Sequence, residues 1–373
     1  MGQGRRVENL EAARHAYEIE ARRQVVLPGF VDSHAYLLWS SSSLPEFEGR
    51  MAAGGVSLVE EVRSAFRDVS LTPSRTLERR GRLACEHYIR QGVTTLEAKT
   101  GWGMDRRGEM KSLRVLSSMA SLPLEIVPTY AGASLGIPLH EASEKERLAW
   151  IEEEMLPLIA RRGFARFVDV RCGRDGFPVD DARRCLTTAR ALGLGLKVQA
   201  EQSGRAGGVR LAVELGAVSA DGLDHVNAED VAALAQSGTV ATLLPAVAFH
   251  RGRERFAPAR ALIDNGAAVA LATGFGPGLN PACSIPMVLA LACRKLRMSP
   301  AEAISAITIN GAHALGCADR AGSLEAGKAA DLVLCDAPDY REIAYCSGGS
   351  LVTLTMKRGQ VLYQRGEVRW PAV

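Results

Sequence analysis

The sequence lacks the features that mark membrane proteins, secreted proteins and disulfide-bonded proteins. The first 24 residues are polar and contain no apolar core of the kind found in a secretory signal. No later stretch offers the roughly 18 uninterrupted apolar residues of a membrane span. The eight cysteines lie far apart and form no C-x-x-C pair, which argues against zinc knuckles and a disulfide framework. We therefore expect a cytoplasmic protein with free thiols and no membrane partner.

An excess of charge of one sign is also missing. The 45 basic and 42 acidic residues leave a formal net charge of +3, and the chain has no long basic run. A nucleic-acid-binding surface would show as a cluster of lysine and arginine residues. We therefore expect small molecules or like subunits as partners, and no nucleic acid. The 373 residues, 47% of them hydrophobic, suffice for a large barrel with an attachment.

No G-x-G-x-x-G turn follows the first expected strand, so a dinucleotide-binding sheet is disfavoured. The opening stretch Val25 to Trp39 instead leads an apolar strand into Asp32, Ser33 and His34. Apolar, β-branched segments then alternate with segments of helical periodicity. The eight expected strands lie within residues 25–39, 93–99, 124–133, 164–172, 194–202, 217–226, 239–245 and 267–275. Eight strands, each followed by a helix, predict an α/β fold, a closed parallel (β/α)8 TIM barrel.

The sequence pattern changes in the C-terminal part of the chain. Ser299, Pro300 and Glu302 predict the start of one more helix through a capping box. Beyond Gly316 the pattern becomes short alternating strands with a turn at Arg358-Gly359. We assign residues 24–321 to the barrel, and residues 1–23 plus 322–373 to a small β-sandwich-like attachment. With only 24 residues before Val25, either this sandwich is reduced at its N-terminus or the recorded start is short.

Several segments together resemble one family. They are LPGFVDSH, TTLEAKTGWG, EIVPTYAGA, SADGLDHV, GTVATLLP, LATGFGPGLNP and GSLEAGKAADLVLCDAPDYREIAY, in this order from residue 25 on. The chain thereby resembles imidazolonepropionase, a histidine-degradation enzyme of the metal-dependent amidohydrolase superfamily. The resemblance implies ring opening of 4-imidazolone-5-propionate by metal-assisted hydrolysis. One zinc or iron would be held by a His-x-His pair, a histidine after the fifth strand and an aspartate after the eighth.

Set onto that pattern, the sequence keeps one ligand position of four. His34 is the remnant ligand, whereas Tyr36, Gln199 and Gly274 replace the other three. A catalytic zinc needs about three protein ligands, but a tyrosine ionises only near pKa 10, a neutral amide binds weakly and a glycine offers nothing. We therefore expect no cofactor, with zinc or iron as the ions to look for if the site is metallated. If ligand loss alone emptied the site, Tyr36→His, Gln199→His and Gly274→Asp together should restore metal binding.

The resemblance also points to further residues at the barrel mouth. Ser134, Gln202 and Trp102 replace a substrate-contacting histidine, an acidic or polar group and a tyrosine of the family, whereas Lys99 and His225 are kept. Lys99 could bind a ligand or pair with a carboxylate such as that of Glu97 or Glu201. Trp102 could stack on a planar ligand or cover the mouth. Neither choice follows from the sequence.

Two functions from different classes remain. In the first, the chain is a non-hydrolytic pseudoenzyme that binds a small planar molecule in the barrel mouth. In the second, it is an active hydrolase of non-peptide C–N bonds, of cyclic amide or imidazolone type, with a rearranged or metal-free site. A rearranged set would join His34 to His225 and Glu201, the candidate catalytic residues, provided that the strand persists to Glu201. The candidate binding residues are Lys99, Trp102, Ser134, Gln199, Gln202 and Tyr36. The family also suggests a homodimer.

Overall fold

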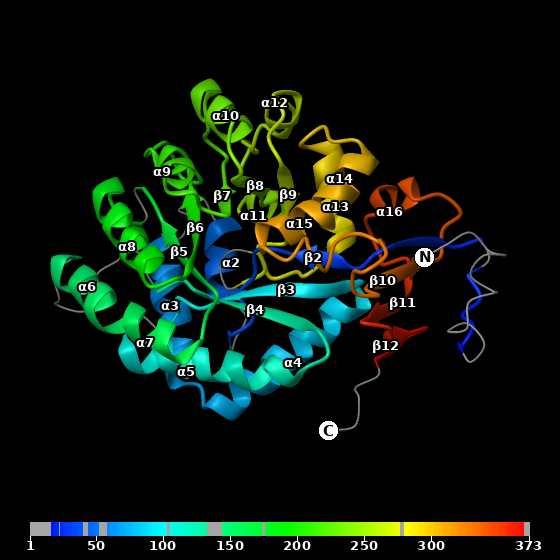
Figure 1. The fold of residues 1–373 in the computed structure, drawn as a ribbon, viewed down its shortest axis with the longest axis horizontal. Helices are drawn as coiled ribbons and strands as arrows, with labels where there is room; N and C mark the ends of the chain where they lie inside the picture. Colours follow the sequence, from blue (N-terminus) through cyan, green and yellow to red (C-terminus); the bar gives the residue numbers. More distant parts are fainter. Residues whose placement is uncertain are drawn as a thin grey trace.

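Eight parallel strands form the centre of the molecule. The computed structural model describes residues 16–21, 23–39, 44–51, 58–102, 105–132, 144–173, 176–276 and 280–368. The strands follow one another around the sheet in sequence order, as Figure 1 shows. They are β2 (Phe30–Asp32), β3 (Val93–Lys99), β4 (Glu125–Tyr130), β5 (Phe167–Arg171), β6 (Gly195–Ala200), β7 (Ser219–Gly222), β8 (Val240–Leu243) and β9 (Val269–Leu271).

The ring of strands closes just beyond the ends of β2 and β9. A parallel bridge joins Ala35 to Phe275, and Tyr36 N donates to Phe275 O at 2.7 Å. Gly274 N donates to His34 O at 3.0 Å. The predicted (β/α)8 TIM barrel is therefore confirmed. The backbone of His34, Tyr36 and Gly274, three of the positions that matched the family's metal ligands, takes part in closing it.

Helices surround the barrel, and at least one follows each strand, as predicted (Figure 1). They are α2 (Leu44–Met51), α3 (Leu58–Leu71), α4 (Ser74–Arg90), α5 (Arg106–Ser118) with the 3₁₀ turn η2 (Met119–Ser121), α6 (Glu144–Trp150), the π-helical turn η3 (Ile151–Met155), α7 (Leu156–Arg162), α8 (Val179–Ala191), α9 (Gly208–Leu215), α10 (Ala228–Ala235), α11 (Pro245–His250), α12 (Ala259–Asp264), α13 (Ile285–Arg294), α14 (Pro300–Ala306), α15 (Ile309–Ala314) and α16 (Arg341–Tyr345). The predicted capping box at the start of α14 is present.

The opening stretch is two strands, and the expectation of one strand was wrong. β1 (Val25–Pro28) pairs antiparallel with β10 (Leu332–Cys335) in a second sheet, whereas β2 belongs to the barrel. Gly29 separates them, and a Cβ at this position would lie 2.3 Å from the Thr94 hydroxyl. A glycine therefore lets the chain pass from one sheet to the other across β3.

The second sheet is the small β attachment predicted from the C-terminal sequence. Its five strands run in the order β1-β10-β11-β12-β13, with β11 (Val352–Lys357), β12 (Gln360–Gln364) and β13 (Glu367–Val368). Arg358 and Gly359 form the predicted turn with φ angles of 50° and 79°. No described residue before Val25 lies in a helix or strand. The division of the chain at residues 24 and 321 stays a prediction.

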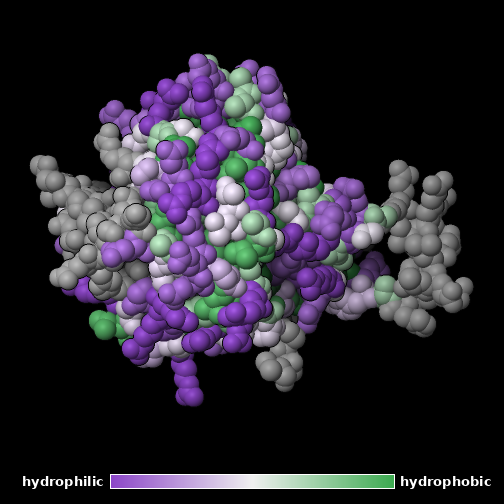
Figure 2. All heavy atoms as spheres, turned by 60° about the vertical axis from the view of Figure 1, so that its left-hand side comes forward, coloured by the Kyte–Doolittle hydropathy of each residue, from purple (hydrophilic) through white to green (hydrophobic). Residues whose placement is uncertain are grey.

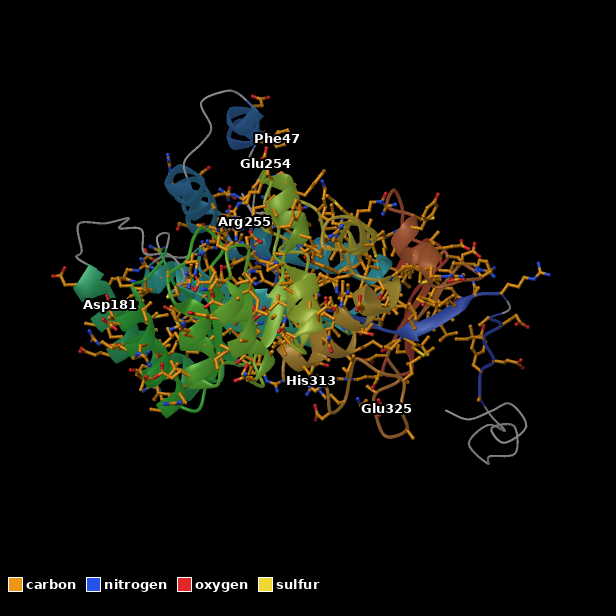
Figure 3. The ribbon with its side chains drawn as sticks, turned by 90° about the horizontal axis from the view of Figure 1, so that it is seen from above. Phe47, Asp181, Glu254, Arg255, His313 and Glu325 are labelled. Carbon is orange, nitrogen blue, oxygen red and sulfur yellow. The ribbon has the colours of Figure 1, made fainter. Side chains whose placement is uncertain are left out.

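The two ends of the barrel carry different elements. Figure 3 places Phe47 of α2 with Glu254 and Arg255 on one side of the molecule, and His313 and Glu325 on the opposite side. The Phe47 ring stacks on His250 of α11, with centroids 5.8 Å apart. Segments that follow β2 and β8 therefore meet at the mouth, the end at which TIM barrels place their active sites.

The polarity of the surface and the state of the cysteines match what the amino-acid composition predicts. On the face shown in Figure 2, hydrophilic residues predominate and hydrophobic residues form small separate patches. Among the described helices, none combines the length and the apolar character that a membrane crossing requires. All eight cysteines are free thiols, and five of them are buried, as expected from their spacing.

Candidate active site

Charged side chains line the inside of the barrel near its mouth. They occupy alternate positions on the four strands β3, β5, β6 and β7, so that they point to the same side of the sheet. These positions are Glu97 and Lys99 on β3, Asp169 and Arg171 on β5, Lys197 and Gln199 on β6, and Asp221 on β7. All seven side chains are buried, with exposed fractions of 8% or less. The barrel therefore holds a polar cluster where a purely structural interior would be apolar.

Lys99 is the centre of this cluster. Its Nζ donates to Asp169 at 2.8 Å and lies 3.3 Å from Asp221 and 3.4 Å from Glu97. Burial lowers the pKa of the ammonium, but the three carboxylates outweigh burial and hold the pKa well above its usual value. Lys99 therefore stays charged, and it pairs with Glu97 rather than with Glu201, the other partner considered from the sequence.

Lys197 is a second buried lysine of this cluster. It donates to Glu97 at 2.9 Å and to the carbonyl oxygen of Ser33 at 3.0 Å. The other Glu97 oxygen accepts from the Thr129 hydroxyl at 2.6 Å. Two lysines and three carboxylates thus form one continuous ion network. Arg171, which is linked to Asp169 through the Gln199 amide, is the third cation, so that the buried charges of the cluster compensate each other.

His34 joins the network through Asp221. Its Nδ1 lies 2.7 Å from Asp221 Oδ2, and the other Asp221 oxygen accepts from Ser219 at 2.6 Å. Burial, followed by the charge of Lys99, lowers the pKa of His34 and favours the neutral ring. Burial raises the pKa of Asp221, but Lys197, Lys99 and His34 together leave it lowered. A carboxylate at Nδ1 selects the tautomer with Nδ1–H, which leaves Nε2 as a proton acceptor.

Tyr36 and Gln199, two of the replaced ligand positions, bond to each other. Gln199 donates to the Tyr36 hydroxyl at 3.1 Å and also to Asp169. Burial raises the pKa of Tyr36 to about 12, so that its phenol stays protonated at neutral pH. Trp102 packs on Tyr36 with ring centroids 5.2 Å apart and is 7% exposed. Trp102 therefore lies against one of the replaced ligand positions, and its two expected roles both stay predictions.

Glu201 and His225 do not join His34. β6 ends at Ala200, and Glu201 has a φ of 51°, so the strand does not persist to Glu201 as the rearranged ligand set required. The Glu201 carboxylate accepts from the backbone N–H groups of Ala206, Gly207 and Val209. The side chain thus caps the start of α9, and the expectation that it faces the barrel mouth was wrong.

His225 lies at the rim, half-buried. Its backbone N–H donates to Glu201 O at 2.8 Å. Burial, and then the charges of Arg255 and Arg253, lower the pKa of its imidazole. The described residues that could hold a metal ion do not include His225. Among the described residues, no hydrogen bond joins the His225 side chain to the charged cluster. The expected catalytic role of His225 therefore stays a prediction.

The remaining predicted residues lie at the mouth or outside the described part. Gln202 is buried and lines a small hollow of about 10 Å³ together with Arg171, Gln199 and Ser203. Ser134 falls outside the described residues. A larger cavity of about 520 Å³ lies elsewhere, between α4 and residues 281–284, and no member of the charged cluster lines it. The charged cluster and this cavity are therefore separate.

The residues present do not fit the divalent metal of the family. In the described part, one group offers ligand atoms within 4.8 Å of one another, namely His34, Glu97 and Asp221. Its atoms are already bonded to each other, to Lys99 or to Lys197. A divalent ion beside these ammonium groups would meet repulsion of about 4 kcal/mol per pair of unit charges at 4 Å, for an effective dielectric constant near 20. The expected absence of a metal stays a prediction.

Sequence reasoning missed four members of the cluster, Asp169, Arg171, Lys197 and Asp221. The sequence does mark these four residues, because a buried strand of a parallel barrel is usually a near-continuous apolar run and a charged residue within it stands out. Charged residues at alternate positions in FVDVR, GLKVQA and SADG mark inward-facing polar positions. Their pairing could not be derived, since it depends on which residues of neighbouring strands lie at the same height.

Comparison with known proteins identifies the family. Residues 25–362 match the model of the Amidohydrolase family. The imidazolonepropionase of Chloroflexus aggregans is 39% identical over 367 residues, which cover 94% of this chain and 85% of that protein. The imidazolonepropionase of Geobacillus thermodenitrificans is 38% identical over 358 residues, covering 94% and 84%.

Solved structures with low sequence identity share the fold. A triazine hydrolase variant superposes with a TM-score of 0.75 at 18% identity, covering 96% of this chain and 87% of that one. An adenosine deaminase from Xanthomonas campestris with bound zinc gives a TM-score of 0.71 at 17% identity, covering 96% and 85%. At this identity the likeness supports the barrel architecture alone.

Proposed function

The chain belongs to the amidohydrolase family as an imidazolonepropionase-like member, and we propose that it is a hydrolase that opens a C–N bond in a cyclic amide or imidazolone ring. The curated relatives named imidazolonepropionase match nearly the whole chain. This support favours the hydrolase over the pseudoenzyme that the missing ligands had suggested. The observation that carries the proposal is the buried His34–Asp221 pair, 2.7 Å apart, next to Lys99 at the barrel mouth.

The pair supplies the acid–base chemistry that hydrolysis needs. With Nδ1–H donated to Asp221, His34 Nε2 accepts a proton from water while the water oxygen bonds to the ring carbonyl carbon. The C–N bond then breaks, and the leaving nitrogen takes the proton back from His34. Asp221 stabilises the transient imidazolium, and Lys99 holds Asp221 in place and ionised. Each step uses residues of this chain alone, in keeping with the poor fit of the site to a divalent metal.

An assay of ring opening tests this proposal. Purified protein is incubated with 4-imidazolone-5-propionate, and the loss of the ring is followed against the uncatalysed rate. His34→Asn should lower kcat about 10²- to 10⁴-fold, the usual contribution of a general base. His313→Asn serves as the matched control, because Figure 3 places His313 on the opposite side of the molecule. If the His34→Asn variant opens the ring as fast as the wild type, His34 is not the general base.

A second candidate function is the non-hydrolytic binding of a small planar molecule in the barrel mouth. It is favoured by the exposed fractions of His34 (1%) and Tyr36 (3%), which leave little room for water and substrate together. Binding of an imidazole ligand by calorimetry, with no turnover above background, would select this candidate. A homodimer and a cytoplasmic location are further proposals that follow from the family resemblance and from the composition.

A further inference from the structure

The cavity of about 520 Å³ that lies apart from the charged cluster is large enough to bind a small organic molecule. It lies between α4 and the segment that leads from β9 to α13. Pockets that bind such molecules usually have volumes of about 300 to 1,000 Å³. No side chain of the charged cluster lines this cavity. An occupant of the cavity would therefore be a second ligand, distinct from the molecule on which the proposed hydrolase acts.

One face of α4 forms the first wall of the cavity. Arg80, Leu83, Ala84, His87 and Gln91 line it, and their spacing of three or four residues places them on the same side of the helix. Gln91 follows Arg80 by about three helical turns, or about 16 Å along the helix axis. The cavity is therefore elongated, with a cation near one end and an amide near the other.

Aromatic rings form part of the opposite wall. Trp39 and Phe275 line the cavity, and their rings meet edge to face with centroids 5.5 Å apart. Leu83 of the first wall is 46% exposed, although its side chain is apolar. An apolar ligand would remove these surfaces from water, and an aromatic ligand would also gain ring-to-ring contacts. The walls therefore favour a ligand with an aromatic body.

Hydrogen bonds fix the second wall within the protein itself. The backbone N–H of Phe275 donates to the Thr273 hydroxyl at 3.1 Å, and the Phe275 carbonyl oxygen accepts from Tyr36 N at 2.7 Å. Ser284, which also lines the cavity, caps α13 by accepting from Met287 N at 3.3 Å. A wall that is already ordered lowers the entropy cost of binding. The cavity is therefore preformed.

Two polar groups of the first wall have unused hydrogen-bonding capacity. Nη1 of Arg80 and Oε1 of Gln91 are buried without a hydrogen-bond partner in the part of the chain that the structure describes. Arg82, on the same helix, instead forms an ion pair with Glu78 at 2.9 Å. A carboxylate is the strongest acceptor for a guanidinium N–H, and an amide oxygen needs an N–H or O–H donor. The two ends of the cavity therefore suit different groups, an anion at Arg80 and a hydrogen-bond donor at Gln91.

We propose that this cavity is a second binding site, which takes an elongated aromatic acid. The carboxylate of the ligand binds Arg80, its aromatic body packs against Trp39 and Phe275, and a donor group at its far end reaches Gln91. This site does not depend on the proposed function, because neither member of the His34–Asp221 pair lines the cavity.

Two rival explanations predict different binding. If the cavity is merely a water-filled crevice, Arg80 creates no preference for a carboxylate over a neutral amide of the same shape. If a second copy of the chain covers the cavity, a ligand has to compete with that copy, and its apparent affinity falls as the protein concentration rises.

The test is equilibrium calorimetry with 4′-hydroxybiphenyl-4-carboxylate and its neutral isostere 4′-hydroxybiphenyl-4-carboxamide. The wild type should bind the carboxylate about ten- to a hundredfold more tightly, as for a charge-assisted hydrogen bond. Arg80→Gln should reduce this ratio to about one. Arg79→Gln is the matched control, because its neighbouring side chain is exposed and does not line the cavity. This control should leave the ratio unchanged.

Two further variants locate the ligand. Leu83→Glu places a carboxylate one turn from Arg80 at an exposed position, where it competes with the ligand for the guanidinium and should also abolish the preference. It decides the test if Arg80→Gln does not fold. His34→Asn should bind the carboxylate as tightly as the wild type does, because His34 lies outside the cavity.

The proposal is wrong if the wild type binds neither compound or binds both equally. It is also wrong if the preference for the carboxylate survives in Arg80→Gln or in Leu83→Glu. Weaker binding by His34→Asn would place the ligand in the barrel mouth, and an affinity that falls with rising protein concentration would assign the cavity to a second copy. None of these results bears on the hydrolase, whose test is ring opening.

Discussion

Gly274 has a backbone conformation that disfavours a side chain. Its φ is 62°, and a Cβ at this position would lie 2.2 Å from Val247 Cγ2. The segment around it is fixed, because Gly274 N bonds His34 O and Phe275 forms the bridge that closes the barrel. An aspartate at this position would therefore have a strained backbone and would have to displace the Val247 side chain of α11.

We predict that Gly274→Asp lowers the free energy of unfolding by about 1–3 kcal/mol, through backbone strain and the clash with Val247. The triple variant Tyr36→His, Gln199→His, Gly274→Asp should then fail to bind zinc tightly, contrary to the expectation from the sequence alone. Denaturant unfolding and zinc calorimetry measure the two effects. Gly238→Asp is the matched control, because no atom lies within 4 Å of its Cβ position. Tight zinc binding by a folded triple variant would contradict this prediction.

Residue-level inference from the sequence succeeded where a single position carries the information. The replaced ligands at Tyr36, Gln199 and Gly274 could be identified one by one, and Glu97 was one of the two carboxylates considered as the partner of Lys99. Asp169 and Asp221 as further partners of Lys99 could not be foreseen, because they come from β5 and β7. The distances between strands depend on barrel geometry, which local patterns do not encode.

At the scale of the element, Glu201 belongs to the start of α9. Its carboxylate accepts backbone N–H groups at 2.6 Å from Ala206, 3.0 Å from Gly207 and 3.4 Å from Val209. The first N–H groups of a helix have no partner within the helix. A carboxylate at this place also interacts favourably with the helix dipole. Because Glu201 lies two residues after Gln199 in the sequence, we expected it to be a catalytic group. Its contacts are instead those of a residue that caps the start of α9.

Glu201→Ala should destabilise the protein by about 1–3 kcal/mol, since it leaves buried N–H groups without an acceptor. Glu201→Gln retains an oxygen acceptor and should cost less. Glu214→Ala on the same helix is the control, because its pair with Arg183 is exposed and should contribute little to stability. Thermal unfolding of the three variants provides the comparison. If Glu201→Ala and Glu214→Ala unfold at the same temperature, the Glu201 cap does not contribute to stability.

The elements themselves were largely predictable, because periodicity and capping signals are local. The eight barrel strands, the helices between them, the capping box at Ser299 and the turn at Arg358-Gly359 all agree with the sequence analysis. The division of the opening stretch at Gly29 was missed. A strand that changes sheets keeps its apolar pattern, so only the long-range pairing of β1 with β10 reveals the change.

At the scale of the whole molecule, one buried lysine connects the small sheet to the barrel. Lys357 of β11 donates to Asp331 at 2.7 Å, to Glu125 at 3.0 Å and to the Thr95 hydroxyl at 3.2 Å. Thr95 and Glu125 belong to β3 and β4 of the barrel. The two sheets therefore share a polar contact that is shielded from water, and its rupture should affect the stability of both.

Lys357→Met should lower the free energy of unfolding by about 3–5 kcal/mol, the cost of leaving buried carboxylates without their cation. Arg358→Met is the control, because this neighbour contacts the same Glu125 at 3.2 Å but is 66% exposed. It should cost at most about 1 kcal/mol. Urea unfolding at neutral pH measures both. A similar loss in the two variants would contradict a special role of the buried lysine.

The same contact predicts how stability depends on pH. Burial raises the pKa of Glu125, but Lys357 and Arg320 outweigh burial and leave it at about 2, below the ordinary value of 4.5. A carboxylate with a lowered pKa contributes stability above the pKa of the unfolded chain, and this stability is lost as the pH falls through the folded-state pKa. The difference between wild type and Lys357→Met should therefore shrink between pH 4.5 and 2.

The central claim is that this amidohydrolase barrel opens a cyclic C–N bond with the His34–Asp221 pair and without the family's metal. The most direct measurement is the initial rate of 4-imidazolone-5-propionate ring opening in samples whose zinc and iron contents are determined by elemental analysis. We predict that chelator-treated and metal-supplemented samples open the ring at the same rate per mole of protein. A rate that rises in proportion to bound metal and vanishes without it would show that the reaction depends on the metal and not on the His34–Asp221 pair alone.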